Sequence, residues 1–401
     1  MNWQQVFPLE GVVQHYDWGG YDYIPQLLGL ENKEQQPYAE LWMGTHPRGA
    51  SVVRKNGQPV SLSQLLSGHP EWLGEKVLGQ FGARLPYLFK VLDVRQMLSI
   101  QAHPNKKQAE AGFQQENEAG IPLDAPRRNF KDDNHKPEVM VAITEFWLLH
   151  GFRRESEVAR VLEEVPEFEP LQQFFTHRNI YELYKAIMEM PQAEVDQLLH
   201  PMDKRLRLLA ETNRLKKEQP EYWAARAFVQ NALPGGRYDR GIFSIFLLNL
   251  MRVMPGQGAY QGAGIPHAYL EGVNVELMAN SDNVFRGGLT TKHVDVPVLL
   301  EHLDFRPVEP RILKGEPISR AEWAYYTPAP DFQLNRIALS AGEFYQARVS
   351  EGPEILFVLE GAVTPVGCDT FTRGQAFFVP AGHPFALHGE EDTVIYKALA
   401  P

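Results

Sequence analysis

The distribution of glycine constrains the fold of this chain more than any other feature of the sequence. The 401 residues contain 32 glycines, yet none lies between Gly151 and Gly235. Glycine weakens helix interiors and is common at the turns and bulges that punctuate strands, so its absence over a long segment favours helices. We therefore expect a mainly β protein that is interrupted by a helical insertion over residues 152–234.

Apolar residues inside this insertion recur at the spacing of an amphipathic helix. Ile180, Leu183, Tyr184 and Ile187 fall at i, i+3, i+4 and i+7, which puts them on one helix face. Prolines that stand alone usually mark where a helix begins or ends. Helix boundaries are therefore expected at Pro166, Pro170, Pro191, Pro201 and Pro220, and the helical segment is expected to end at Pro234-Gly235-Gly236.

On both sides of the insertion, short runs of Val, Ile, Phe and Tyr are bounded by Gly, Pro, Asn and Asp, which is typical of strands in a sandwich or barrel. Strands are expected over residues 86–92, 98–103, 138–143, 259–270 and 272–278, and in several runs after Leu339. Helices are expected over residues 71–81, 106–118 and 296–303. This pattern favours a β-barrel interrupted by the insertion and followed by a smaller β unit.

The charge of the chain argues against nucleic acid as a partner. There are 39 Lys and Arg against 50 Asp and Glu, a formal net charge of −11, whereas binding to a phosphate backbone needs clustered cations. No apolar run approaches the roughly 18 residues of a membrane helix, and the first residues lack the pattern of a signal peptide. We expect a cytoplasmic protein with no membrane partner; the sequence leaves the oligomeric state open, with a monomer favoured.

The single cysteine, Cys368, excludes an intramolecular disulfide and a cysteine-based zinc cluster. Any metal must therefore be bound by His, carboxylate or amide groups. In the expected strand 98–103, alternation puts Ser99, Gln101 and His103 on one face and apolar residues on the other. Such a polar face suits a ligand-lined cavity, although a half-exposed strand in water would show the same pattern.

Two further segments present polar side chains near an expected strand. Lys136 and Glu138 project to the same side where a strand begins, and Pro137 is tolerated at that position. By themselves they would form an ordinary surface ion pair. His267 follows a glycine-rich stretch and a proline, and a lone histidine is more often structural than a ligand.

Taken together, four of these residues form a plausible metal-binding set. Gln101, His103, Glu138 and His267 offer two imidazoles, a carboxylate and an amide oxygen, which suits a catalytic zinc with an exchangeable position. The two histidines and the glutamate would also make the facial triad of an iron-dependent oxygenase. Gln101 separates the alternatives, because a fourth protein ligand fills a position that oxygen chemistry needs.

A family resemblance rests on four motifs that occur in a fixed order. They are Ser99-Ile100-Gln101-Ala102-His103-Pro104-Asn105-Lys106, Asn134-His135-Lys136-Pro137-Glu138, Ile265-Pro266-His267-Ala268-Tyr269 and the segment from Met278 to Thr290, which contains Asn283-Val284-Phe285-Arg286. With these motifs the sequence resembles the type I mannose-6-phosphate isomerases. The resemblance extends from Tyr16-Asp17-Trp18-Gly19 and Ala39–Pro47 to about residue 300.

The resemblance implies a fold as well as an activity. It implies a catalytic cupin (jelly-roll) barrel over residues 1–151 and 235–325, the helical insertion over 152–234, and a second, cupin-like barrel over 326–401. It also implies one Zn2+ per chain, bound by Gln101, His103, Glu138 and His267. The expected reaction is the interconversion of mannose 6-phosphate and fructose 6-phosphate in carbohydrate metabolism, where it can serve GDP-mannose biosynthesis.

The C-terminal barrel is expected to bind no metal. Phe385 stands where a metal-binding cupin carries a histidine, and the strand over residues 345–349 offers no pair of histidines. His383 and His388 are the residues that could make this expectation wrong.

The resemblance also implies that Arg286 is catalytic. An isomerase of this kind moves a proton between two carbons through an enediol, and a metal with a fixed guanidinium can stabilise the developing charge. Candidates for the proton carrier are Lys136, His135, Asp282 and Glu276. Lys136 is favoured, with a contact to phosphate or hydroxyl as its alternative role. Asp282 suits the orientation of Arg286 or a sugar hydroxyl, and Ser99, His135 and Glu276 are expected to bind substrate.

A non-catalytic sensor of sugar phosphates is the alternative from a different functional class. In such a protein the metal barrel would bind the ligand and the helical insertion would contact a partner. Nothing in the sequence resembles a DNA-reading module that would transmit the signal.

Overall fold

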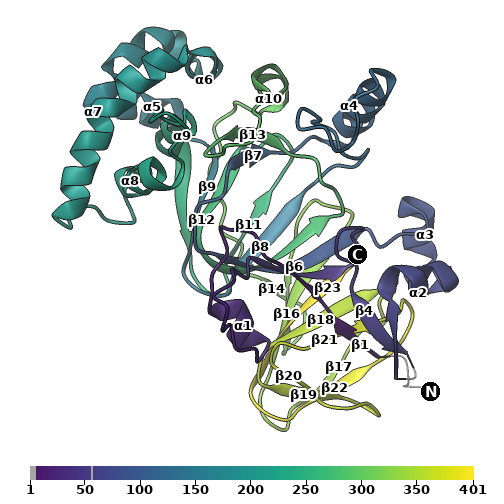
Figure 1. Cartoon of the computed structure of the whole chain (residues 1–401). Coiled ribbons are helices and arrows are strands. Elements are labelled where there is room, and N and C mark those ends of the chain that lie inside the picture. The colour runs from purple at the N-terminus through teal and green to yellow at the C-terminus, as the bar shows by residue number, and fades with distance from the viewer. Residues whose placement is uncertain (1–5, 56) are drawn as a thin grey trace.

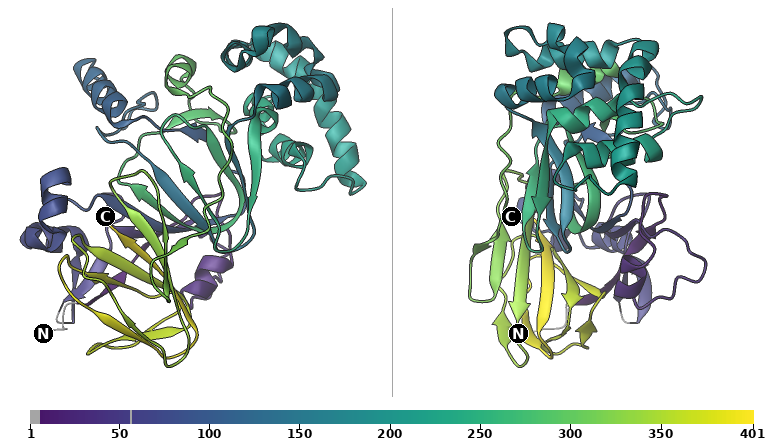
Figure 2. Two further views of the ribbon diagram at one scale, coloured as in Figure 1. Left: turned by 180° about the vertical axis from the view of Figure 1, so that it is seen from behind. Right: turned by 90° about the vertical axis from the view of Figure 1, so that its left-hand side faces the viewer.

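The computed structural model describes residues 6–55 and 57–401 (Figure 1). Two large sheets and a small one form the body of the molecule, and a group of helices lies at one end (Figure 2). The prediction of a mainly β protein with helices is confirmed. Across the described residues, no helix combines the length and the apolar character that crossing a bilayer requires.

The sheet that carries the predicted metal ligands has ten strands among the described residues. They are β2 (Val12–Gln14), β3 (Glu40–Gly44), β6 (Tyr87–Val94), β7 (Ile100–Ala102), β8 (Glu138–Ala142), β9 (Phe146–Phe152), β10 (Leu248–Val253), β11 (Gly258–Gln261), β12 (His267–Ala279) and β13 (Phe285–Gly288). The main path runs β10-β9-β12-β6-β3-β2; β7 and β8 join it at β12, β13 pairs with β7, and β11 pairs with β8. Because β12 pairs with β6, β7, β8 and β9, it organises the whole sheet.

The second large sheet combines strands from both ends of the chain. Its order is β14 (Glu316–Pro317), β15 (Glu322–Tyr325), β16 (Gln333–Leu339), β23 (Thr393–Leu399), β18 (Glu354–Glu360), β21 (Ala376–Val379), β1 (Phe7–Glu10), β4 (Val52–Lys55) and β5 (Gln58–Ser61). A small sheet of β17 (Phe344–Gln346), β22 (Ala386–Gly389), β19 (Ala362–Pro365) and β20 (Phe371–Thr372) lies beside it. The N-terminal strand β1 pairs antiparallel with β21, so neighbours in this sheet are not neighbours in sequence.

Helices fill most of the segment in which glycine is absent. They are α5 (Glu155–Glu164), α6 (Ile180–Glu189), α7 (Gln192–Glu211) and α8 (Pro220–Gln230), with 3-10 turns over Pro166–Phe174 and Thr176–Arg178. The expected boundaries at Pro166, Pro191 and Pro220 are confirmed. The expectation was wrong for Pro170 and Pro201, which lie inside a 3-10 turn and inside α7.

Tertiary packing explains why α7 continues through Pro201. Leu199, Met202 and Leu206 around the proline are fully buried, and burial of such side chains offsets the loss of a helical hydrogen bond. One more short helix, α9 (Gly241–Leu247), follows Pro234, and every residue of α9 is buried.

The remaining helices border the sheets. They are α1 (Tyr23–Leu27), α2 (Leu62–Gly68), a 3-10 turn over Pro70–Leu73, α3 (Glu75–Phe81), α4 (Lys106–Glu118) and α10 (Val296–His302). The helices expected over 106–118 and 296–303 are confirmed. The helix expected over 71–81 is divided at Gly74, whose φ of 80° a helix cannot contain.

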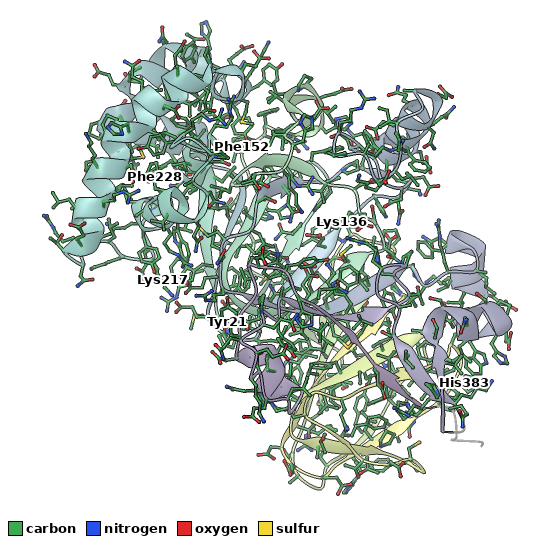
Figure 3. All side chains as sticks on the ribbon, in the orientation of Figure 1. Tyr21, Lys136, Phe152, Lys217, Phe228 and His383 are labelled. Atoms are coloured by element: carbon green, nitrogen blue, oxygen red, sulfur yellow. The ribbon has the colours of Figure 1, made fainter. Side chains whose placement is uncertain are left out.

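Aromatic side chains join the helices to the ten-stranded sheet. Phe152 of β9 lies edge-on to Tyr184 of α6 with 5.2 Å between the ring centroids, and Trp147 of β9 lies 5.8 Å from Trp223 of α8. Figure 3 shows Phe152 and Phe228 at this junction. A second core of buried apolar residues fills the space between the two large sheets. The strands that carry the site therefore pack against one apolar core shared with the helices and against a second core shared with the other large sheet.

The strand β12 differs from its prediction in an informative way. The sequence indicated a break before Gly272, but β12 runs through it, with a register shift between Tyr269 and Glu271. Gly272 has φ of 128°, a conformation that side chains disfavour and glycine adopts freely. The glycine therefore bends the strand without ending it.

Gly272→Ala should lower the free energy of unfolding by about 1–3 kcal/mol, because the new Cβ would strain a left-handed backbone and would lie 2.6 Å from the backbone oxygen of Glu145. Gly262→Ala is the matched control, since its nearest contact would be an ordinary 3.5 Å. Chemical denaturation measures both. Equal stability of the two variants would contradict this account of the bend.

Candidate functional site

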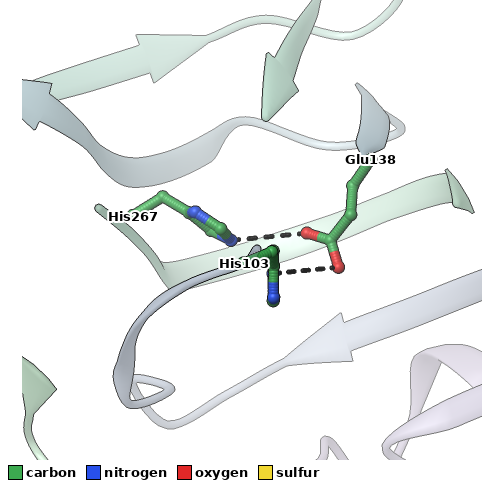
Figure 4. Close-up of side chains that lie close together, drawn as sticks. All are labelled: His103, Glu138 and His267. Atoms are coloured by element: carbon green, nitrogen blue, oxygen red, sulfur yellow. Dashed lines mark ion pairs between the residues drawn. The ribbon is translucent and has the colours of Figure 1, made fainter. Parts of the chain in front are cut away.

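Three metal-binding side chains meet at the ends of three strands. His103 directly follows β7, Glu138 begins β8 and His267 begins β12 (Figure 4). Nε2 of His103 lies 3.5 Å from Oε1 of Glu138, and Nε2 of His267 lies 3.3 Å from its Oε2. All three ligand atoms lie within 4.8 Å of one another, so one cation could contact them all.

The hydrogen bonds of the two imidazoles prepare them for a metal. Nδ1 of His103 lies 2.8 Å from the backbone oxygen of Asn283, and Nδ1 of His267 lies 2.9 Å from that of Ile265. A carbonyl can only accept, so Nδ1 carries the proton and Nε2 presents its lone pair. Both Nε2 atoms are buried without a hydrogen-bond partner in the described part of the chain. Burial also lowers the pKa of His103 to about 4, which keeps it neutral.

The carboxylate of Glu138 is held in its charged form. The side chain is only 2% exposed, and although burial favours the neutral acid, the charge of Lys136 holds its pKa well below the usual range. Nζ of Lys136 lies 2.9 Å from Oε1, while Oε2 has no hydrogen-bond partner among the described residues. Two imidazoles and an ionised carboxylate are a ligand set that zinc accepts.

Strand register places Gln101 and Arg286 beside this group. On β7, Gln101 is opposite His267 of β12 on one side and opposite Arg286 of β13 on the other. Directly opposed residues point to the same face of a sheet. Gln101 therefore lies between His267 and Arg286 in one row of side chains.

Of the remaining predicted site residues, some contact the group of His103, Glu138 and His267 and others do not. Lys136 contacts this group directly through Glu138, whereas Nε2 of His135 lies 2.8 Å from a carboxylate oxygen of Asp331. Ser99 lies directly before β7 and is half-buried.

Glu276 and Asp282 are each held by partners that the sequence analysis did not identify. The carboxylate of Glu276 lies 3.1 Å from Nζ of Lys90 and accepts a 2.8 Å hydrogen bond from the hydroxyl of Tyr269. The carboxylate of Asp282 lies 2.6 Å from the Arg48 guanidinium and 3.2 Å from Nε2 of His46. Although burial opposes the charge of Asp282, these partners lower its pKa to about 2.

One sequence signal could have found Lys90. It stands in the apolar run of β6, a strand that is buried along its whole length, and lysine is rarely buried without a carboxylate partner. Its partners here are Glu276 and Glu40, at 3.1 and 3.4 Å. These two carboxylates raise the pKa of Lys90 even though burial opposes this, so the lysine stays charged.

Two lysines lie within electrostatic range of Arg286. Burial lowers the pKa of Arg286, of Lys131 and of Lys292, and the charge of Arg286 lowers the pKa of both lysines further. At Lys131 the carboxylates of Glu116 and Asp282 act in the opposite direction. In a chain of net charge −11, this concentration of positive charge next to a row of metal ligands suits an anionic ligand.

Known proteins share both the sequence and the fold. The family described as phosphomannose isomerase type I, catalytic domain, matches residues 6–155. Mannose-6-phosphate isomerase from Escherichia coli (strain K12) is 39% identical over 359 residues, with 88% of each chain covered. The Homo sapiens mannose-6-phosphate isomerase is 34% identical over 430 residues, with 98% of each covered.

The same relationship appears in three dimensions. A crystal structure of mannose 6-phosphate isomerase from Salmonella typhimurium, bound to its substrate fructose 6-phosphate and to zinc, superimposes with a TM-score of 0.87 at 33% identity, and 99% of each chain is covered. Sequence identity and fold agree over nearly the whole length, and the chain therefore belongs to the type I phosphomannose isomerase family.

Proposed function

We propose that this protein is a zinc-dependent aldose–ketose isomerase that interconverts mannose 6-phosphate and fructose 6-phosphate through an enediol intermediate. The observation that carries the proposal is the buried group of His103, Glu138 and His267, whose unpartnered atoms converge. Membership of the family supports the same substrates, because a relative binds fructose 6-phosphate and zinc.

When bound, zinc supplies Lewis-acid stabilisation of substrate oxygen atoms that gain negative charge. His103, Glu138 and His267 would hold the ion, and the register of β7 makes Gln101 the proposed fourth ligand. The protein contributes the arrangement of the ligands in advance: two imidazoles whose Nδ1 atoms are held by backbone oxygens, and one ionised carboxylate. Such prior organisation avoids the cost of rearranging the ligands during the reaction.

Arg286 is the proposed catalytic cation. It is fixed on β13 next to Gln101, where a guanidinium can stabilise an enediolate oxygen by charge-assisted hydrogen bonds. Lys131 and Lys292 lie in the same electrostatic neighbourhood and would attract the phosphate group. The hydroxyl of Ser99 is a proposed further contact to the phosphate, because this residue immediately precedes β7.

Lys136 is the proposed proton carrier between the two carbons. Among the candidates it alone contacts the metal-binding group, through its 2.9 Å contact with Glu138, and a carrier must lie within hydrogen-bond reach of the reacting atoms. Asp282 is proposed to orient substrate together with Arg48, and Glu276 with Lys90. His135 is proposed as a substrate contact at the side of Asp331.

The proposal also covers the domains of the chain and the place where the protein acts. We propose a catalytic cupin barrel over residues 1–151 and 235–325, a helical insertion domain over 152–234 and a cupin-like barrel without metal over 326–401. This last point is supported by the described residues, among which His383 and His388 belong to no group of three or more His, Cys, Asp or Glu side chains that could hold a metal. The proposed protein is a cytoplasmic monomer that acts on a small sugar phosphate.

His267→Ala should reduce bound zinc and isomerase activity to background together, because it removes one of three buried ligands. Zinc is measured by atomic absorption, and turnover of mannose 6-phosphate by a coupled assay. His200→Ala is the matched control, since His200 is exposed on α7, and it should keep both. Turnover that survives complete chelation of zinc would exclude the proposed mechanism.

Arg286→Ala should retain zinc but lower kcat/KM by about 10²–10³-fold, as expected when a preorganised donor is removed. Arg286→Lys should recover part of the rate, because it keeps the charge and loses the two-pronged geometry. Steady-state kinetics with zinc content measured in parallel checks both variants. Near-normal turnover of Arg286→Ala would show that the residue has another role.

Lys136→Met keeps the length of the side chain and removes its proton-carrying group. It should lower kcat by about 10²–10⁴-fold while zinc remains bound, and it should slow hydrogen exchange between solvent and the substrate carbon to the same extent. Lys76→Met, at an exposed surface position, should change neither. If exchange continued at the normal rate in Lys136→Met, the proton carrier would be a different group.

A further inference from the structure

Two irregular loops lead into strands that carry groups of the site. One covers residues 131–137, carries Lys136 and enters β8 at Glu138; the other covers residues 280–284, carries Asp282 and connects β12 to β13, the strand of Arg286. Most residues of both loops are buried or half-buried. Buried backbone that belongs to no strand needs side chains to satisfy its hydrogen bonds.

Asn283 supplies these bonds from the centre of the second loop. It is 0% exposed. Its Oδ1 accepts a 2.6 Å hydrogen bond from the backbone nitrogen of Lys131, and its Nδ2 donates to the backbone oxygens of Asp132 and Asn134, both at 2.8 Å. Because a rotated amide would set donor against donor, this orientation is unique.

Asp132 supplies the reciprocal bonds from the first loop. Its Oδ1 accepts from the hydroxyl of Ser281 at 2.7 Å and from the backbone nitrogen of Asn134 at 3.0 Å. Its Oδ2 accepts from the backbone nitrogen of Asp282 at 2.7 Å. The carboxylate and the carboxamide also meet directly, at 3.2 Å between Oδ1 and Nδ2 of Asn283.

Asn283 also contacts His103, one of the proposed metal ligands. The backbone oxygen of Asn283 accepts the 2.8 Å hydrogen bond from Nδ1 of His103 that fixes its tautomer and ring orientation. Displacement of Asn283 would therefore turn the imidazole, while a change at Asp132 would shift the backbone that precedes Lys136 and Glu138.

We propose that Asp132 and Asn283 form a clasp that positions the active site, with the two residues acting through His103, Glu138 and Asp282 rather than on substrate. This inference rests on the proposed isomerase function for its effect on rate, and on the geometry alone for its effect on metal binding. A displacement of about 1 Å can cost a hundredfold in rate, and loss of an outer-shell contact typically costs 10–100-fold in metal affinity.

Asn283→Asp tests the clasp with almost no change of shape. The variant replaces a donor by an oxygen that faces Asp132 and two carbonyls. We expect zinc affinity, measured by competition with a chelator, to fall about 10–100-fold, and kcat to fall about a hundredfold.

Asn335→Asp is the matched control. Asn335 is 2% exposed and donates a 2.6 Å hydrogen bond to Glu322 in the nine-stranded sheet, so the substitution likewise sets one buried carboxylate against another. It should lower thermal stability in the same way, yet leave the zinc affinity and kcat of the folded protein at the wild-type level.

Asp132→Asn decides the question if Asn283→Asp does not fold, because it removes the charge and turns a donor toward the amides of the opposite loop. Its zinc affinity should also fall. Wild-type zinc affinity in a folded clasp variant, or an equal loss in Asn335→Asp, would overturn the proposal. Failure of the zinc-loaded wild type to convert mannose 6-phosphate would instead reject the proposed function, and the affinity measurements would still decide the clasp.

Discussion

The structure depends on keeping one ionised carboxylate and two imidazoles together in a buried place. Burial opposes the charge of Glu138, and Lys136 offsets this penalty from 2.9 Å away. Removal of one partner from such a buried pair typically costs about 3–5 kcal/mol. The imidazoles are fixed through backbone carbonyls. The ligand geometry is therefore a property of strand ends and loops that meet at β12.

Other buried charges in the site are likewise paired with opposite charges. Lys90 is paired with Glu40 and Glu276 inside the sheet, and Asp282 is paired with Arg48. Lys131 and Lys292 lie within electrostatic range of Arg286, although the chain as a whole is acidic. Balanced charges near the metal ligands and an excess of positive charge beside them fit a substrate that has a sugar at one end and a phosphate at the other.

Local sequence patterns predicted the features that depend on neighbours along the chain. The lack of glycine predicted the helices between β9 and β10, hydrophobic alternation predicted β7, and a short apolar run predicted β8. The grouping of His103, Glu138 and His267 followed from their types and from the family motifs, and the structure brings these three together. The roles of the individual site residues and the domain boundaries remain predictions.

Features that depend on which strands become neighbours could not be predicted. Glu40, Lys90 and Glu276 meet because β3, β6 and β12 lie side by side in a particular register, and a shift of one residue would separate them. The pairing of β1 with β21 joins segments from opposite ends of the chain. The continuation of α7 through Pro201 reflects burial by distant residues, which overrides the local preference of proline.

Anomalous scattering at the zinc absorption edge, from crystals of the zinc-loaded protein, tests the central claim most directly. The account predicts a single strong peak at about 2.0–2.2 Å from Nε2 of His103, Nε2 of His267 and a carboxylate oxygen of Glu138, the distances usual for zinc with nitrogen and oxygen ligands. A peak elsewhere in the molecule, or none between these three side chains, would contradict it.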